Sequence, residues 1–300
     1  MLYAALPLAF ALFQTPVVTD SSAPADIVAA LDRSSTRRIT THPGGRMVWR
    51  IWGSGYPLVL LHGGSGSWMH WLRNIEALAR DFMVLVPDQP GFGESDLPAE
   101  ETVTPDSFAA LVQAGVDAML GDQHFSYAGF SMGAAIAGHA APLAGTRLDH
   151  LVLVGAAGLR LASPPMQPLQ SWRRLPTDAE KAAVHRRNLS ILMLRDPARI
   201  DDLAVHIQAR NSVQVRLRKI NLSTHSVLAE RLAQSRAAIS SIWGERDAIA
   251  DGYLDLRRDL IESIRPGSSF DVIPGAGHWV QYEAAEAFNT LLRERLRPSA

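Results

Sequence analysis

Short apolar runs alternate with longer stretches of helical periodicity along most of this chain. The apolar runs are bounded by Gly, Pro or polar residues, which is typical of strands, and the first two form a hairpin across a Pro-Gly-Gly turn. Strands are predicted at 36–41, 47–52, 56–61, 82–86, 124–129, 148–154, 237–243 and 269–273. Helices are predicted at 68–80, 104–120, 134–141, 253–264 and 280–296. This alternation predicts a doubly wound, mostly parallel α/β sheet.

The alternation stops between residues 161 and 236. This stretch has a Pro-rich start, reads as successive helical segments and contains no convincing strand. We therefore predict a helical cap at 161–236, inserted into a core made of 35–160 and 237–300. From Arg160 to Arg236 the chain has 14 Lys and Arg against 6 Asp and Glu. That charge either favours an anionic substrate or simply faces water and the acidic core.

Residues 1–34 are expected to form an apolar extension ahead of the core. The first 13 residues carry no charge, and Ala23-Pro-Ala25 matches an A-x-A cleavage pattern, so the segment has features of a signal or an anchor. However, no Lys or Arg precedes Arg33 and Pro7 interrupts the apolar run. A cytoplasmic protein is therefore the first expectation, with export as the alternative.

Composition narrows the choice of function. With 300 residues and 47% hydrophobic content, the chain can bury one large core with an insertion. A net charge of −1 gives no reason to expect nucleic acid as a partner. The absence of cysteine excludes disulfides, thiolate catalysis and cysteine-bound zinc. No interior apolar run reaches the roughly 18 residues of a membrane span. The sequence does not indicate an oligomeric state.

The strongest chemical signal is Gly129-Phe130-Ser131-Met132-Gly133, between a predicted strand and a small-residue helix. This is the G-x-S-x-G pattern of a nucleophile elbow, in which a serine occupies a strained turn and the glycines avoid collisions. The helix that follows directs free backbone N–H groups and a positive dipole end at the reaction. By itself the pattern also suits an ordinary tight turn, so the interpretation depends on the other motifs in the chain.

A second motif, His62-Gly63-Gly64-Ser65, follows the predicted strand at 56–61. Glycine after a strand lets a backbone N–H approach a substrate oxygen, as a second oxyanion donor must. The alternative is a tight strand-to-helix turn without chemistry.

An acid and a histidine complete the pattern, each after a late strand. Asp247 follows 237–243 and His278 follows 269–273, so both belong at the carboxyl edge of the sheet with Ser131. Serine needs a base, and a carboxylate holds the imidazole in the right tautomer. Glu245 and Asp251 are rivals of Asp247, but Glu245 lies closer to the strand end and Asp251 further around the loop.

Together these motifs resemble the α/β-hydrolases that carry a helical cap. The matches are H-G-G at 62, D-x-P-G-x-G-x-S at 88, G-x-S-M-G at 129, W-G-x-x-D at 243 and G-H-W at 277, and the resemblance covers about 35–297. It implies an oxyanion hole made by the backbone N–H groups of Gly64 and Met132, with Ser65 beside the pocket. It implies no metal and no organic cofactor, because the chemistry needs only water.

Three functions remain open within this resemblance. Dehalogenases and epoxide hydrolases of this fold carry aspartate at the elbow, so Ser131 argues against them. The stretch from Gly277 to Asn289 is similar to the hydrolases that cleave the carbon–carbon bond of meta-cleavage products, with Trp279 in the pocket and Arg210 binding a carboxylate. Phe130 departs from that group, which has a small polar residue there, and favours a simple carboxylic ester. A receptor that has lost its chemistry is the third alternative.

Overall fold

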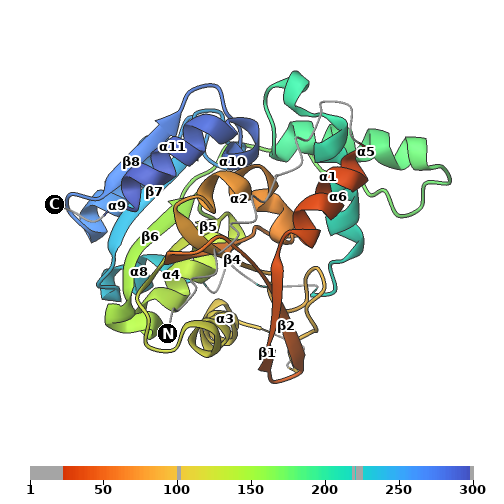
Figure 1. Cartoon of the computed structure of the whole chain (residues 1–300). Helices are drawn as coiled ribbons and strands as arrows, with labels where there is room; N and C mark the ends of the chain where they lie inside the picture. The colour runs from red at the N-terminus through yellow and green to blue at the C-terminus, as the bar shows by residue number, and fades with distance from the viewer. Residues whose placement is uncertain (1–22, 100–102, 218–219, 221–225, 298–300) are drawn as a thin grey trace, which may run out of the picture.

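The computed structural model describes residues 23–99, 103–217, 220 and 226–297. Its centre is one eight-stranded sheet with helices on both faces (Figure 1). The strands are β1 (Thr36–His42), β2 (Gly45–Trp52), β3 (Tyr56–Leu61), β4 (Phe82–Pro87), β5 (Phe125–Phe130), β6 (Leu148–Val154), β7 (Ala238–Gly244) and β8 (Ser269–Ile273). Every predicted strand is present, with ends that differ by a few residues at most.

The strand order is β1-β2-β4-β3-β5-β6-β7-β8. β2 pairs antiparallel with both β1 and β4, and all the other neighbours are parallel. The predicted doubly wound sheet with an N-terminal hairpin is therefore confirmed. The carboxyl ends of β3, β5, β6, β7 and β8 meet at one edge, where open parallel sheets bind their ligands.

Apolar residues on both sides of each central strand explain why the sheet is covered twice. Along β3, Val59 and Leu61 belong to one hydrophobic cluster, whereas Leu58 and Leu60 belong to the other. Successive side chains of a strand point to opposite faces, so a continuous apolar run needs a layer of helices on each side.

The helices divide between those two layers. One layer contains α3 (Pro105–Leu120), α4 (Met132–Ala144), α8 (Leu228–Gln234) and α9 (Leu254–Ile264). The other contains η1 (Trp68–Trp71), α2 (Leu72–Leu78), α10 (Val280–Glu283) and α11 (Ala285–Arg295). The single helices predicted at 68–80 and 280–296 are thus each divided in two.

The cap is smaller and less helical than its sequence indicates. Its helices are α5 (Asp178–Leu192), the short η3 (Pro197–Arg199) and α6 (Asp202–Val213), and residues 159–177 form neither helix nor strand. α8, expected in the cap, packs against α4 in the core layer: a Cβ on Gly138 would lie 2.3 Å from Leu228 Cδ1. Its apolar residues Leu228 and Leu232 face α4, and an amphipathic pattern does not reveal which partner a helix covers.

Part of the expected N-terminal extension is a helix of the folded unit. α1 (Pro24–Arg33) packs against α6 and buries Val28 and Leu31 (Figure 1). Residues 1–22, which include the apolar run, lie outside the described part of the chain. Among the described residues, no helix combines the length and apolar character required to cross a membrane.

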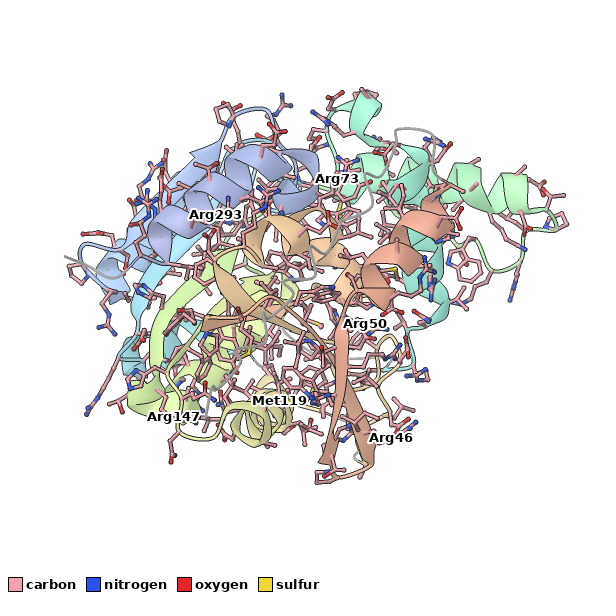
Figure 2. All side chains as sticks on the ribbon, in the orientation of Figure 1. Arg46, Arg50, Arg73, Met119, Arg147 and Arg293 are labelled. Atoms are coloured by element: carbon pink, nitrogen blue, oxygen red, sulfur yellow. The ribbon has the colours of Figure 1, made fainter. Side chains whose placement is uncertain are left out.

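Arginines connect elements that are distant in sequence. Figure 2 labels Arg73 on α2, which pairs with Asp201 at the start of α6 and stacks over the Tyr282 ring at 4.0 Å. The Tyr282 hydroxyl donates to Asp201 at 2.7 Å. This group attaches the cap to the layer formed by α2 and α10.

Candidate active site

Ser131 occupies the turn between β5 and α4 in a strained conformation, with φ 53° and ψ −113°. The flanking glycines explain how the turn fits. A Cβ on Gly129 would lie 2.3 Å from the Gly133 carbonyl oxygen, and one on Gly133 would lie 2.4 Å from that of Leu61. Any larger residue would force the strand and helix apart, so the G-x-S-x-G pattern follows from packing in this chain.

His278 lies within hydrogen-bonding distance of both Ser131 and Asp247. Ser131 Oγ is 3.0 Å from His278 Nε2, and His278 Nδ1 is 2.9 Å from each oxygen of Asp247. His278 and Asp247 are almost completely buried. A proton on Nδ1 leaves Nε2 free to accept from the serine hydroxyl, which is the arrangement a serine nucleophile requires.

The two rival acids have other partners. Glu245 accepts the Gly275 N–H at 2.8 Å, and Asp251 pairs with Arg246 at 2.9 Å. Asp247 also accepts the Ile249 N–H at 2.9 Å, which fixes its carboxylate on the inner side of the loop. Of these three acids on the loop after β7, Asp247 is the one that contacts His278.

Gly63 and His70 shape the turn after β3. The Gly63 N–H donates to His70 Nδ1 at 3.2 Å, so this imidazole accepts in its neutral form. Burial lowers the pKa of His70 well below its ordinary value, and the nearby His62 and His278 rings lower that pKa further. The Gly63 N–H is thereby occupied, which leaves the next residue, Gly64, as the candidate donor on this loop.

Gly64 adjoins the start of α4. A Cβ on Gly64 would lie 3.9 Å from Met132 Cβ, so the two backbones face one another across the site. Met132 is the first residue of its helix, where a backbone N–H has no intrahelical acceptor. The arrangement can present two N–H groups to one substrate oxygen.

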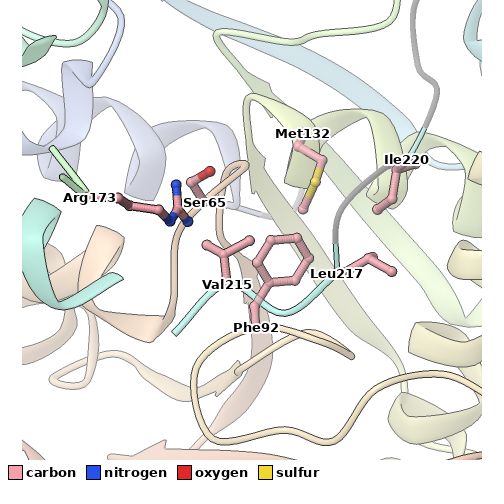
Figure 3. Close-up of a pocket in the computed structure, with 7 residues that line it drawn as sticks. All are labelled: Ser65, Phe92, Met132, Arg173, Val215, Leu217 and Ile220. Atoms are coloured by element: carbon pink, nitrogen blue, oxygen red, sulfur yellow. The ribbon is translucent and has the colours of Figure 1, made fainter. Parts of the chain in front are cut away.

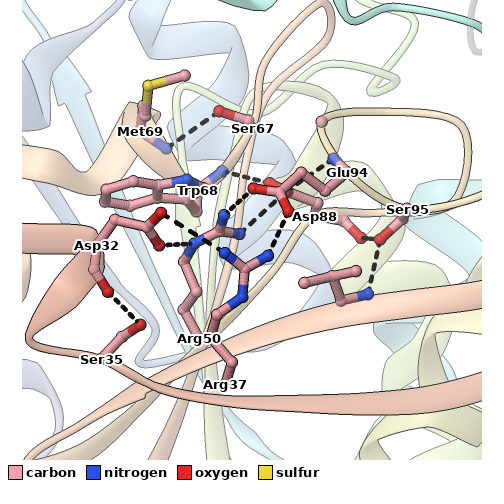
Figure 4. A network of polar contacts seen from close by, with 12 residues as sticks. Asp32, Ser35, Arg37, Arg50, Ser67, Trp68, Met69, Asp88, Glu94 and Ser95 are labelled. Atoms are coloured by element: carbon pink, nitrogen blue, oxygen red, sulfur yellow. Dashed lines mark hydrogen bonds and ion pairs between the residues drawn. The ribbon is translucent and has the colours of Figure 1, made fainter. Parts of the chain in front are cut away.

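The D-x-P-G-x-G-x-S loop is held by a buried carboxylate, Asp88 (Figure 4). Asp88 accepts backbone N–H groups from Trp68 at 2.9 Å and Glu94 at 3.0 Å, and pairs with Arg50 at 3.1 Å. Arg50 is itself 1% exposed, lies 5.0 Å from the Trp68 ring and also binds Asp32 of α1. The loop therefore joins the hairpin, α1 and η1.

A cavity of about 580 Å³ opens beside this loop and the start of α4 (Figure 3). Its walls come from the turn after β3, the loop after β4, the elbow and the cap. The lining residues are Ser65, Phe92, Met132, Arg173, Val215, Leu217 and Ile220. The Gly91 carbonyl accepts the N–H groups of Arg216 at 2.9 Å and Leu217 at 3.1 Å, which holds the cap wall against the core.

Comparison with known proteins identifies the family to which this chain belongs. The sequence profile of the alpha/beta hydrolase fold matches residues 56–285. The chain belongs to the α/β-hydrolase family. A 2-hydroxy-6-oxo-6-phenylhexa-2,4-dienoate hydrolase of Burkholderia cepacia is 30% identical, over 87% of this chain and 96% of the relative.

Solved structures agree on the fold. The carboxylesterase CesB of Bacillus subtilis superposes with a TM-score of 0.73 at 19% identity, over 92% of this chain and 99% of its own. The meta-cleavage product hydrolase CumD of Pseudomonas fluorescens gives 0.68 at 23% identity, over 83% and 93%. The resemblance stated from the motifs is confirmed, and this chain is a hydrolase of that family.

Of the four pocket residues predicted for this α/β-hydrolase, Ser65 lines the cavity and three do not. Trp279 is wholly buried; its indole N–H donates to the His70 carbonyl at 2.9 Å and its ring stacks on Tyr282. Phe130 lies behind the site, with its ring 5.0 Å from that of His278. Both aromatic side chains belong to the hydrophobic cluster on one face of the sheet.

Arg210 is the third of these residues that does not line the cavity. It lies on the exposed side of α6 and is absent from the cavity wall. Among the described residues that line the cavity, Arg173 is the cation, and it lies in the irregular stretch before α5 (Figure 3). Helical periodicity gives no direction for Arg173, because this residue lies outside any regular element.

Other lining residues were also missed. Phe92 lies in the D-x-P-G-x-G-x-S loop after β4, and Val215, Leu217 and Ile220 follow α6 without a regular pattern. An apolar group in an otherwise polar loop was the available signal for Phe92. Among the described residues, no group of three or more His, Asp or Glu side chains is arranged to hold a metal ion.

Proposed function

We propose that this α/β-hydrolase cleaves small carboxylic esters with Ser131 as nucleophile, through an acyl-enzyme. The observation that carries the proposal is the chain of contacts from Asp247 through His278 to Ser131 Oγ, with a cavity beside the start of α4. A serine hydroxyl becomes an effective nucleophile when a positioned imidazole takes its proton.

In the first half-reaction, Ser131 Oγ attacks the ester carbonyl carbon while His278 Nε2 takes the hydroxyl proton. Asp247 stabilises the imidazolium that forms. The negative charge on the carbonyl oxygen is met by the N–H groups of Gly64 and Met132. When the tetrahedral intermediate collapses, His278 returns the proton to the departing alcohol and the acyl group stays on Ser131.

In the second half-reaction, water replaces the alcohol. His278 takes a proton from water as it attacks the acyl carbonyl, and returns that proton to Ser131 Oγ when the acid leaves. The same N–H pair stabilises the second oxyanion. The proton transfers between Ser131 and His278 use groups that are already within hydrogen-bonding distance.

The cavity supports a short or medium acyl or alcohol group. Phe92, Val215, Leu217 and Ile220 provide apolar contact, and about 580 Å³ suits a small organic molecule. Ser65 adds a polar group near the elbow.

Carbon–carbon hydrolysis of a 2-hydroxy-6-oxo-dienoate is the second candidate. Two observations favour it: the dienoate hydrolase of Burkholderia cepacia is 30% identical over nearly its full length, and Arg173 offers a cation at the cavity. In this reaction water is added across the bond beside the 6-oxo group, and the substrate carboxylate would bind Arg173.

Parallel assays separate the two candidates. Turnover of p-nitrophenyl butyrate and of 2-hydroxy-6-oxo-6-phenylhexa-2,4-dienoate is compared, with Ser131→Ala as control. We expect higher kcat/KM on the ester and a loss of at least about 10⁴-fold in the variant. A strong preference for the dienoate would support the second candidate. Undiminished ester turnover in Ser131→Ala would refute the catalytic assignment, and ligand binding without any turnover would indicate a receptor.

The role of Arg173 has its own test. Replacing it with Ala should raise KM for esters that carry a carboxylate about 10- to 100-fold, since hydrogen bonds to charged groups contribute about 1.5–3 kcal/mol. KM for neutral esters should change little. Arg174→Ala is the matched control, because Arg174 is exposed and lies outside the cavity wall. Equal effects of Arg173→Ala on both ester classes would exclude carboxylate binding.

A further inference from the structure

Glu283 is a buried carboxylate at the end of α10, and its exposed fraction is 6%. Three backbone N–H groups donate to it: those of Arg195 at 2.7 Å and Asp196 at 2.6 Å to Oε1, and that of Gly277 at 2.6 Å to Oε2. Burying a charged group is costly unless it is fully hydrogen-bonded, so this carboxylate has a specific task in the fold.

The donors come from two different parts of the molecule. Gly277 immediately precedes His278, whereas Arg195 and Asp196 lie between α5 and η3 of the cap. Each oxygen of Glu283 therefore binds a different segment. One carboxylate bridges the cap and the loop that carries the base.

The same cap segment touches both catalytic loops at further points. The backbone N–H of Trp279 donates to the Met193 carbonyl at 2.8 Å, and Arg195 Nε donates to the Arg246 carbonyl at 2.8 Å. Arg246 precedes Asp247 in the chain. Residues 193–196 thus lie against the backbone on either side of the His278–Asp247 pair.

Packing around Gly277 leaves little freedom. A Cβ there would lie 2.9 Å from the Met193 carbonyl oxygen and 3.0 Å from Glu283 Oε2. The cap backbone and the Glu283 carboxylate are therefore closely packed against Gly277, the residue before His278. Movement of the cap segment would be transmitted to the imidazole.

We propose that Glu283 is a positioning residue. It couples the position of the cap segment 193–196 to the distance between His278 and Ser131. The inference rests on the proposed function of His278 as the base. Displacement of a reacting group by about 1 Å costs on the order of 10²-fold in rate. Because each carboxylate oxygen serves one segment, an amide, which has a single acceptor oxygen, holds either the cap or Gly277 but not both.

The first test is Glu283→Gln, with Glu286→Gln as matched control. Both changes remove one negative charge within the same short stretch, but Glu286 is exposed. We expect kcat on p-nitrophenyl butyrate to fall about 10- to 100-fold in Glu283→Gln, with KM within about twofold. The rate at which a fluorophosphonate labels Ser131 should fall in parallel. Wild-type kcat and labelling in a folded Glu283→Gln protein would overturn the inference.

A backbone variant tests the cap contact without altering the carboxylate. Asp196 has φ −80°, which proline adopts, so Asp196→Pro removes the N–H that binds Glu283. Asp196→Ala removes the same side chain and keeps that N–H. We expect a lower kcat for the proline variant than for the alanine variant at similar KM. Equal kcat values would show that the cap does not act through Glu283.

These outcomes differ from those that test the reaction itself. Retained ester turnover in Ser131→Ala refutes the proposed nucleophile whatever Glu283 does. Loss of turnover in Ser131→Ala, together with normal kcat in Glu283→Gln, refutes only the positioning role.

Discussion

At the scale of single residues, the site depends on which of several similar side chains meets the imidazole. Glu245 and Asp247 lie two residues apart on one loop, yet Asp247 contacts His278 and Glu245 caps the Gly275 N–H. The loop turns here, since the Asp247 N–H donates to the Gly244 carbonyl at 3.2 Å. Chemical role here follows from the direction in which a side chain points.

Asp247→Asn should lower kcat on p-nitrophenyl butyrate by about 10⁴-fold, because an amide favours the wrong tautomer of the imidazole. Folding should persist, since shape and size are retained. Glu245→Gln is the control and should leave kcat within about twofold. A fully active Asp247→Asn enzyme would mean that another group orients His278.

At the scale of elements, Asp106 joins three helices of one layer. Its carboxylate on α3 accepts from Arg231 of α8 at 2.9 and 3.0 Å and contacts His139 Nδ1 of α4 at 2.7 Å. The hydrogen bond from Arg231, together with His139, lowers the pKa of Asp106 to about 2. This contact helps to hold α8 on the core.

Stability should therefore depend on pH through Asp106. Its folded pKa is lower than its unfolded value of 3.8, so its contribution is complete above pH 4 and is lost as pH falls towards 2. After allowance for its partial exposure, Asp106→Asn should lower the free energy of unfolding by about 1 kcal/mol at pH 7. Urea unfolding at several pH values measures this. The difference from wild type should shrink at low pH, and the exposed Asp122→Asn should show no such trend.

At the scale of the whole molecule, α1 connects the start of the described chain to both the cap and the core. It covers α6, and its Asp32 binds Arg50, which also pairs with Asp88 and with Glu94. The segment that the sequence placed ahead of the catalytic unit thus contributes to it.

A chain that begins at Ser35 should be less stable than one that begins at Ala23. Loss of the burial of Val28 and Leu31 alone costs about 3–6 kcal/mol, and Arg50 also loses a partner. Chemical denaturation of the two chains gives the difference directly. Equal unfolding midpoints would show that α1 adds nothing to the stability of the core or the cap.

The sequence by itself determined the strands, the class of sheet and the family. Strands buried on both faces need continuous apolar runs, and a strained turn such as that at Ser131 needs glycine at fixed offsets, so both leave local patterns. The order Ser131, Asp247, His278, each after a strand, also followed from sequence, because parallel strands bring their carboxyl ends to one edge.

Only the tertiary structure decided what surrounds those residues. Trp279 in the core and Phe92 in the cavity wall are both apolar residues in loops, and pattern does not distinguish a buried side chain from one that lines a pocket. Arg173 reaches the cavity because of how an irregular segment packs, and Arg210 faces outward because the opposite side of α6 is packed against the molecule. Such contacts depend on the whole chain, since long-range packing has no local period.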